Sequence, residues 1–485
     1  MPDDEEPNYA ADFVAHMTAA TGDDWQKIWS APEVSVEEEV IHTLHRGQVR
    51  LAQLFAAAYR DRLMFIYGIG WHYYDSTRWV ADDCGMAGQA VLTMLEDGLT
   101  SDDKDLLTDI HRCETSHGMH GILTVAASMR PFAYTTRDLD ADPHLLNTVG
   151  GTLDLKTFEY RDHDPADKIT KVCGGSYKAT STGPMWEMFL ARVLPAAEVR
   201  EFLQRYVGLG LLGAVREHVL AIFTGTGANG KDTLCKAIAH ALGDYATVAE
   251  PGLFMHREGG HPAGEMALRG VRWVTVSETD KGHHLAEATM KRLTGGGTIT
   301  ARYMRQNWVT FTPSHTAALV TNHLPKVTGD DPALWRRLRV VPFDVVIPDG
   351  EQDTRLDERL KSEVDAILTW AIVGYRSYVE GGLAEPGAVK GATGDYRKES
   401  DALARFIEDC CHLADGESAT TRTLFCRWEK WCRSDGSDAG SEKAFAQDLD
   451  RRGLPAKKTK IGAVRRGIGL VPEEDDMSSN AYWNS

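Results

Sequence analysis

The sequence predicts an α/β protein built around a mainly parallel sheet, and three observations favour this fold class. Over residues 219–343, apolar strands alternate with loops and helical runs, as in parallel sheets with helical crossovers. A glycine-rich loop directly follows the first of these strands. The hydrophobic content of 42% and charged content of 26% in 485 residues are typical of a folded protein with a sizeable core.

The chain before the sheet is expected to be mostly helical. Apolar residues spaced by three and four predict a helix over residues 40–67. The aromatic segment 71–79, with an Asp-Ser turn in its middle, predicts a hairpin, and short strands follow over 138–170. Residues 185–213 have a helical period that Pro195 interrupts, which predicts two helices.

Charge is distributed unevenly along a chain whose net charge is −18. Residues 1–40 hold eleven acids and one base and predict an acidic tail, whereas residues 451–470 hold seven bases and no acid. The basic run is either a binding surface for a polyanion or a solvated face, and charge alone does not decide between them.

Two classes of protein are excluded by the sequence. No apolar run is long enough for a membrane helix and the first residues are acidic, so we expect a soluble protein of the cytoplasm. Eight irregularly spaced cysteines do not make a disulfide framework. The cluster His111, Cys113, His117 and His120 is either a zinc site or, as we favour, a set of surface polar residues, because no second ligand pair stands at finger spacing.

The strongest motif is a phosphate-binding loop. Residues 219–223 form an apolar strand, the glycine-rich loop 225–231 ends in Gly-Lys, and a helical run over 234–242 follows. Glycines let backbone N–H groups converge on phosphate oxygens at the helix N-terminus, and Lys231 neutralises the β- and γ-phosphates. The residues predicted to bind ATP are Gly225, Thr226, Gly227, Ala228, Asn229, Gly230, Lys231, Asp232 and Thr233.

One position of the loop departs from the usual pattern. The Ser or Thr expected after the lysine is Asp232, with Thr233 one residue later. That hydroxyl normally ligates Mg²⁺, so either Asp232 or Thr233 takes its place. A carboxylate beside the phosphates also adds repulsion, which favours nucleotide binding over fast turnover.

Polar residues at the ends of later strands complete a predicted catalytic set. Glu278 ends the strand 271–278 and is predicted to hold Mg²⁺ or polarise the attacking water. Asn322 ends the next apolar strand and is predicted to orient that water or touch the γ-phosphate. Arg336 and Arg337 stand at the start of a further strand, where an arginine is able to reach a neighbouring subunit's γ-phosphate.

The order of these motifs resembles the phage and plasmid primase-helicase family. The resemblance rests on the loop 225–231, Ser277-Glu278, residues 290–296, 300–302, 321–325 and 335–338, and on the segments 142–155 and 393–403 outside the motor. It implies an AAA+-like superfamily 3 helicase core, a preceding region similar to poxvirus NTPases and a C-terminal winged helix. The implied domains are an acidic tail (1–40), an N-terminal α+β region (41–212), the ATPase (213–380), a linker (381–399) and the winged helix (400–485).

The resemblance also implies a function and its residues. Such motors are usually hexameric rings that bind ATP between subunits, with Lys231, Glu278 and Asn322 in one subunit and Arg337, or Arg336, from its neighbour. The implied ligands are ATP and Mg²⁺ (at Asp232, Thr233 and Glu278), a single DNA strand in the pore, duplex DNA at the winged helix, and a separate primase or replication protein. The implied DNA-binding residues are Arg302 and Arg305 in a pore hairpin, and Lys457, Lys458, Lys460, Arg465 and Arg466 in the wing.

Two departures and two alternatives remain. Gly297 stands where an acid is usual, and residues 1–130 are too few for a polymerase domain, so we expect no priming activity. The preferred interpretation is a replicative DNA helicase of a phage, prophage or plasmid in a bacterial cytoplasm. The alternatives are an ATP-binding initiator or loader with weak hydrolysis, and a P-loop kinase or nucleotidase acting on a small molecule.

Overall fold

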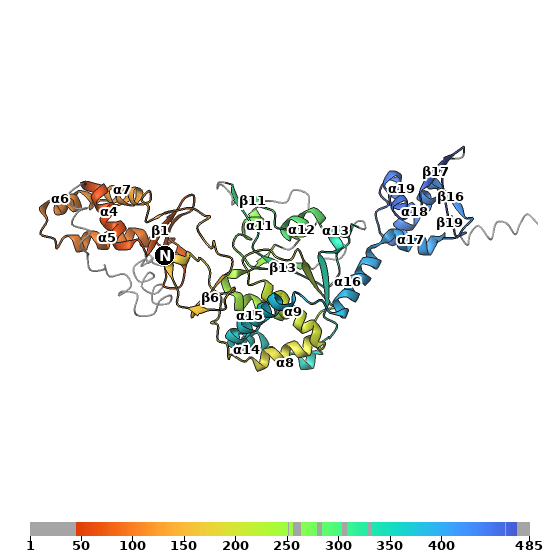
Figure 1. Ribbon diagram of the computed structural model, residues 1–485, viewed down its shortest axis with the longest axis horizontal. Coiled ribbons are helices and arrows are strands. Elements are labelled where there is room, and N and C mark those ends of the chain that lie inside the picture. Colours follow the sequence, from red (N-terminus) through yellow and green to blue (C-terminus); the bar gives the residue numbers. More distant parts are fainter. Residues whose placement is uncertain are drawn as a thin grey trace, which may run out of the picture. The chain divides into compact units, whose positions relative to one another are not determined.

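The computed structural model describes residues 45–250, 252–255, 263–278, 284–302, 308–327, 331–460 and 462–472. The acidic tail predicted over residues 1–40 lies outside this part of the chain. Two compact units are present, Met1–His323 with Arg337–Val389 (unit 1) and Leu324–Arg336 with Lys390–Ser485 (unit 2). Figure 1 shows the elements of both units along the chain.

Unit 1 begins with a helical module that carries a small sheet. The helix predicted over residues 40–67 is shorter, because α4 spans Gly47–Tyr59 and the chain then forms strand β1 (Leu63–Ile66). The apolar run of β1 fits either a helix or a strand, and its antiparallel pairing with β2 decides for the strand. The hairpin predicted over residues 71–79 is confirmed. The remaining elements are β2 (Gly70–Tyr74), β3 (Trp79–Ala81), α5 (Met86–Gly98), α6 (Lys104–Cys113), α7 (Ser116–Ala126) and β4 (Ala133–Tyr134).

A three-stranded antiparallel sheet and two helices lead to the main sheet. The break predicted at Pro195 is confirmed, since it lies between α8 (Pro184–Val193) and α9 (Ala197–Leu209). The carboxylate of Glu363 accepts hydrogen bonds from the backbone N–H groups of Met185 and Trp186 and so caps α8. The small sheet comprises β5 (Leu145–Thr148), β6 (Gly151–Asp154) and β7 (Tyr160–Arg161), followed by the 3₁₀ turn η2 (Pro165–Asp167).

The centre of unit 1 is a five-stranded sheet in the order β14-β8-β13-β10-β9, and every neighbouring pair is parallel. The predicted parallel sheet is therefore confirmed. Its strands are β8 (Leu220–Thr224), β9 (Ala246–Ala249), β10 (Trp273–Glu278), β13 (Thr316–Thr321) and β14 (Leu338–Pro342). Its connections include α10 (Lys231–Leu242), η3 (Gly243–Tyr245), α11 (Ala263–Met266), α12 (Glu287–Leu293) and the hairpin of β11 (Ile299–Ala301) and β12 (Val309–Phe311).

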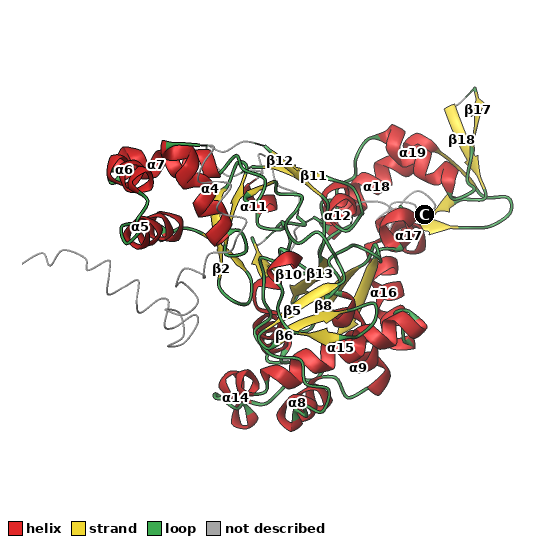
Figure 2. Cartoon of the chain, turned by 60° about the vertical axis from the view of Figure 1, so that its left-hand side comes forward, coloured by secondary structure: helices red, strands yellow, loops and turns green. Residues whose placement is uncertain are grey.

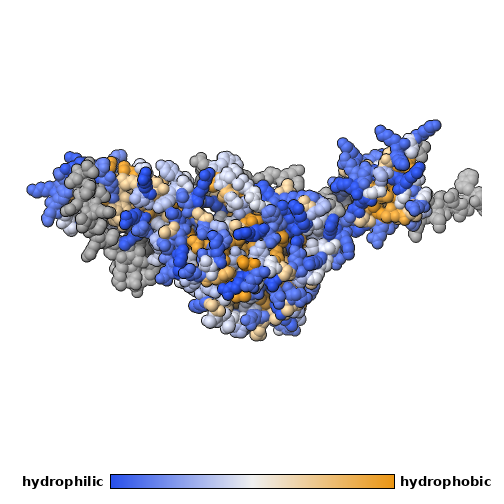
Figure 3. Space-filling model, viewed as in Figure 1, coloured by the Kyte–Doolittle hydropathy of each residue, from blue (hydrophilic) through white to orange (hydrophobic). Residues whose placement is uncertain are grey.

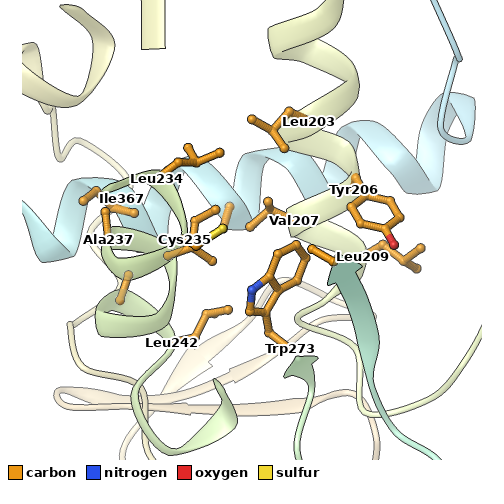
Figure 4. Close-up of a cluster of buried hydrophobic side chains, with 14 of the residues drawn as sticks. Leu203, Tyr206, Val207, Leu209, Leu234, Cys235, Ala237, Leu242, Trp273 and Ile367 are labelled. Carbon is orange, nitrogen blue, oxygen red and sulfur yellow. The ribbon is translucent and has the colours of Figure 1, made fainter. Parts of the chain in front are cut away.

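Helices lie on both sides of the sheet, which explains why its strands β8 and β13 are almost entirely buried. Residues 220–223 of β8 are all buried, as expected of a strand covered on both faces. Below the sheet in Figure 1 lie α9 and α15 (Val364–Gly381), while α11 and α12 lie above it, and Figure 2 agrees. Figure 4 shows side chains of α9 and α10 around Trp273 of β10, with Ile367 of α15 beside those of α10. The segment between β14 and α15 adds η4 (Asp349–Glu351) and α14 (Leu356–Ser362).

Unit 2 combines helices with a three-stranded antiparallel sheet in the order β16-β18-β17. Helices span residues 421–435 and 442–451, and an antiparallel hairpin follows over residues 456–466. Residues 387–399, which belong to the predicted linker 381–399, form most of helix α16 (Gly387–Ser400). The other elements are α13 (Pro332–Trp335), α17 (Ala402–Cys410), β15 (Cys411–His412), β16 (Ser418–Thr420), α18 (Thr421–Asp435), α19 (Glu442–Arg451), β17 (Ala456–Thr459), β18 (Gly462–Arg466) and β19 (Gly469–Leu470).

Candidate functional site

The carboxyl ends of three neighbouring strands lie side by side in the parallel sheet. The last residues of β8, β13 and β10 are register partners, with Thr224 beside Thr321 and Thr321 beside Glu278. The glycine loop (residues 225–231) leaves β8 at its carboxyl end, and Asn322 directly follows β13. The sheet order thus brings together the loop, Asn322 and the backbone of Glu278, whose side chain lies outside the described part. Ligands of parallel α/β sheets bind at the carboxyl ends of the strands.

The glycine loop depends on its small residues. A Cβ atom at Gly225 would stand 2.4 Å from the carbonyl oxygen of Phe343 and 2.3 Å from the amide nitrogen of Asn229. Gly230 has a φ of 81° and immediately precedes α10, where its Cβ would stand 2.6 Å from Val193. The Asn229 amide donates to the Phe343 carbonyl at 3.1 Å, which ties the loop to the end of β14. The loop is thereby held in a tight turn before a helix N-terminus.

Lys231 points its ammonium group into the space between these strand ends. Its Nζ donates to the Gly225 carbonyl at 2.8 Å, to Oδ1 of Asn229 at 3.0 Å and to Oδ1 of Asn322 at 3.2 Å. The residue is only 3% exposed, and burial lowers the pKa of its ammonium below the ordinary range of lysine, although the charge of Asp232 acts in the opposite direction. All three acceptors are neutral, and no described carboxylate forms an ion pair with it.

This arrangement fits an anionic ligand. A buried ammonium without a carboxylate partner gains most from a negative charge placed beside it. Asp232 and Thr233 occupy the first turn of α10, where Asp232 is exposed and Thr233 is half-buried. A nucleotide's phosphates would lie against the loop N–H groups and Lys231, and a divalent cation would be held by Asp232 or Thr233. The carboxylate of Asp232 supplies the hard oxygen ligand that Mg²⁺ prefers.

Arg337 lies at the amino-terminal ends of the strands, opposite the carboxyl ends where the glycine loop lies. Its carbonyl accepts a hydrogen bond from the N–H of Leu220, the first residue of β8, at 2.7 Å. β8 has five residues and so spans about 16 Å, which separates Arg337 from the glycine loop of its own chain. The Arg337 side chain donates to Oγ1 of Thr294 at 3.4 Å. Arg336, in unit 2, is exposed at the end of α13.

The predicted pore hairpin corresponds to β11 and β12, which pair antiparallel. Arg302 follows β11 and is exposed, and its guanidinium lies 4.6 Å from the centre of the Trp308 ring. Arg305 lies outside the described residues. Trp308 was not among the predicted DNA-binding residues, although its alternation with Thr310 and Thr312 was a usable signal.

The basic run of unit 2 divides into exposed and buried residues. Lys457, Lys458 and Lys460 (the hairpin lysines) and Arg466 are exposed on or beside the hairpin of β17 and β18. The surface of this hairpin, at the upper right of Figure 3, is hydrophilic on the face shown.

Arg465 is a correction to the predicted DNA-binding set. It is 1% exposed, and its guanidinium donates to Oγ1 of Thr421 at 3.0 Å, to Asp450 at 2.6 Å, to the Ala446 carbonyl at 2.9 Å and to the Leu454 carbonyl. These bonds join β18 to α18 and α19. Its donors are used inside the unit, so Arg465 is a structural residue.

The histidine and cysteine cluster gives no sign of a metal centre. Cys113 is buried at the end of α6, whereas His111 is exposed and its Nδ1 lies 3.0 Å from the carboxylate of Glu114. Across the described part of the chain, no three His, Cys, Asp or Glu side chains come close enough to share a metal ion. Within the same residues, no helix is long and apolar enough to cross a membrane.

Two family models match the chain, one before and one after the segment that forms the parallel sheet. Residues 52–195 match the family described as D5 N terminal like, and residues 398–460 match the family described as Poxvirus D5 protein-like. The chain therefore carries two D5-type domains, and the resemblance to primase-helicases with poxvirus-type regions is confirmed. The first match takes in the N-terminal module, the three-stranded sheet and α8, and the second takes in α17 to β17.

The curated relatives come from large DNA viruses. "Putative helicase L207/L206" of Acanthamoeba polyphaga mimivirus is 26% identical over 341 residues, covering 65% of this chain and 36% of the relative. "Putative helicase 184R" of Invertebrate iridescent virus 6 is 23% identical, with coverages of 65% and 37%. "Putative primase C962R" of African swine fever virus is 25% identical, with coverages of 58% and 32%. The chain thus spans about a third of the length of these relatives.

A solved structure also aligns with the chain. The apo form of the NrS-1 C-terminal region (305–718) aligns with a TM-score of 0.48 and 10% identity, covering 88% of this chain and all of that one.

Proposed function

We propose that this protein is an ATP-dependent DNA helicase that couples ATP hydrolysis to movement along DNA. The observation that carries the proposal is the position of Lys231, whose buried ammonium lies among the glycine loop, Asn229 and Asn322 at the carboxyl ends of parallel strands. Relatives named helicase or primase support the same class of activity.

In this proposal the carboxyl ends of the strands form a P-loop nucleotide site. Backbone N–H groups of the glycine loop bind the phosphates, and Lys231 leaves its neutral acceptors to bind the β- and γ-phosphates. Mg²⁺, bound by Asp232 or Thr233 with Glu278, would neutralise charge that develops on the phosphates. Asn322, released by Lys231, becomes able to orient the attacking water. Glu278 is assigned to polarising that water, and its position at the end of β10 suits this role.

The position of Arg337, at the end of β8 that lies away from the glycine loop, supports assembly into a ring. An arginine some 16 Å from the loop of its own chain, at the far end of β8, is suited to completing the site of an adjacent subunit. We propose a homo-hexamer with Arg337 as the arginine finger and Arg336 as its alternate. A homo-oligomeric ring repeats one interface, so every site receives the same arginine.

Two described surfaces are proposed to contact DNA. The hairpin of β11 and β12, with Arg302, is assigned to the single strand inside the ring. Unit 2, whose element order α17, β16, α18, α19, β17, β18 we interpret as a winged helix, is assigned to duplex DNA. Its hairpin lysines would contact phosphates, which position the protein on the duplex and read no sequence.

Asp232 favours a second candidate function. A carboxylate in place of the usual hydroxyl adds repulsion near the phosphates, as expected of an ATP-binding initiator or loader with weak hydrolysis. The kinase or nucleotidase alternative is not supported by any relative. The separate primase partner, the phage, prophage or plasmid origin and the bacterial cytoplasm stay predictions.

A forked-duplex unwinding assay tests the proposal. The protein should displace one strand when ATP and Mg²⁺ are present, and Lys231→Ala should not. DNA-stimulated ATP hydrolysis without strand displacement would favour the loader. Hydrolysis that DNA does not stimulate would contradict both interpretations and return the small-molecule alternative.

A further inference from the structure

The hairpin of β11 and β12 has one buried face and one exposed face. Ile299 and Ala301 are fully buried, and their partners Phe311 and Val309 are half-buried. Side chains alternate along a strand, so the intervening residues face outward. Six exposed residues make up this outer face (the threonine face): Thr298, Thr300, Arg302, Trp308, Thr310 and Thr312.

Arg302 and Trp308 form the last rung of this face. The register pairs Thr300 with Thr310 and Ala301 with Val309, so Arg302 and Trp308 stand opposite each other one step further along. The guanidinium lies 4.6 Å from the ring centre, as in a cation–π pair. Trp308 is nevertheless 55% exposed, so the arginine leaves much of the indole ring accessible.

The chemistry of the threonine face fits a single nucleic-acid strand. Its six side chains include one cation and no carboxylate, as a polyanion requires. The hydroxyls of Thr300 and Thr310 are 3.0 Å apart and are able to donate to or accept from phosphates and sugars. An exposed indole offers a flat surface on which any base stacks, so binding of this kind is tolerant of sequence.

We propose that Trp308 is a base-stacking residue, which binds a base of single-stranded nucleic acid while Arg302 orients the indole ring and contacts the adjacent phosphate. This deepens the proposed function and rests on it, because it assigns a particular contact to the motor's single-strand surface. A duplex keeps its bases stacked on one another, so this contact selects single strands.

The test compares two oligonucleotides of equal length, an oligothymidine and a strand that lacks bases. Fluorescence anisotropy of the full chain, without ATP, measures both affinities. The wild type should bind the oligothymidine roughly tenfold more tightly. Trp308→Ala should bind both strands equally, because without the indole ring the bases of the oligothymidine have no surface on which to stack. Trp308→Leu, which keeps apolar bulk on the hairpin but removes the aromatic ring, should behave in the same way.

A matched control and a charge variant complete the design. Tyr67→Ala removes an aromatic residue that is 62% exposed in the N-terminal module and should keep the tenfold preference. Arg302→Ala should weaken binding to both strands and flatten its salt dependence by about 0.7 of a slope unit, the value for one phosphate contact on a single strand.

Three results would overturn the stacking role without contradicting the proposed motor. Equal affinity of the wild type for both strands would exclude base contacts. A preference for the oligothymidine that survives in Trp308→Ala and Trp308→Leu would place the base contact elsewhere. Loss of this preference in Tyr67→Ala as well would mean that the substitutions damage the protein in general. In each case DNA-stimulated ATP hydrolysis would still support the motor. A wild type that binds neither strand would remove stacking and the proposed DNA function together.

Discussion

Arg465 is the buried link between strand β18 and the helices of unit 2, and Arg465→Met should loosen that unit. Methionine fills a similar volume but leaves the acceptors at Thr421, Ala446 and Leu454 without their donor. Each loss costs about 1 kcal/mol, and the ion pair with Asp450, whose side chain is 52% exposed, adds at most about 1 kcal/mol. The expected destabilisation of unit 2 is therefore about 3–4 kcal/mol.

Hydrogen exchange of the full chain measures this effect where it occurs. Amides of α18, α19 and β18 should lose protection in Arg465→Met, while those of the parallel sheet keep theirs. A calorimetric transition of unit 2 should fall by about 12 °C or more, given some 4 °C per kcal/mol for a domain of this size. Arg466→Met is the matched control, because Arg466 is exposed on the same strand and such changes stay within about 0.5 kcal/mol. Equal protection in the two variants would refute the structural role of Arg465.

The other predictions concern the nucleotide, the ring, the hairpin lysines and pH. Lys231→Ala should abolish ATP hydrolysis in a coupled phosphate assay; unchanged turnover would contradict the nucleotide site. Arg337→Ala should bind ATP but hydrolyse it poorly, and mixing it with Lys231→Ala should restore some activity; mixed rings without recovery would exclude trans completion. Changing the three hairpin lysines to Ala should flatten the salt dependence of duplex affinity by up to about one slope unit per lost contact, whereas identical slopes would make them a solvated face. Burial lowers the pKa of His315 from 6.5 to about 4, so the unfolded state binds a proton at a higher pH than the folded state. The free energy of unfolding should therefore fall by up to about 3 kcal/mol as the pH drops from 6.5 to 4. Urea titrations should show a smaller fall for His315→Gln, and an equal fall in variant and wild type would refute the role of His315.

The parallel sheet was predictable because its signals are local. The strand before the glycine loop, the loop itself and the helix after it are contiguous, and each has its own pattern. The order of the strands was not predictable from those patterns, because it depends on pairing between segments that are distant in sequence, such as β8 and β14. The meeting of Asn322 and Lys231 follows from that order.

Where a local sequence pattern fits two structures, the prediction from it was wrong. The run at Leu63–Ile66 continued a helical spacing but found a strand partner in β2. Residues 381–387 are rich in glycine and proline, yet α16 begins at Gly387 and buries Val389 and Tyr396, two turns apart. Arg465 stood in a run of bases that looked uniformly exposed, and its burial depends on carbonyls of α19 and the following turn that no local signal reveals.

The place of β8 in the sheet has a consequence for synthesis of the chain. Its two neighbours are β13 and β14, which begin at Thr316 and Leu338, about 100 residues after β8 itself. During translation the most apolar strand of the sheet therefore emerges with both hydrogen-bonding edges unpaired, and it stays so for several seconds at ordinary elongation rates. Unpaired apolar edges are sites of aggregation. A fragment that contains β13 but ends before β14 would leave one edge of β8 unpaired permanently, so a stable fragment of the parallel sheet must extend past β14.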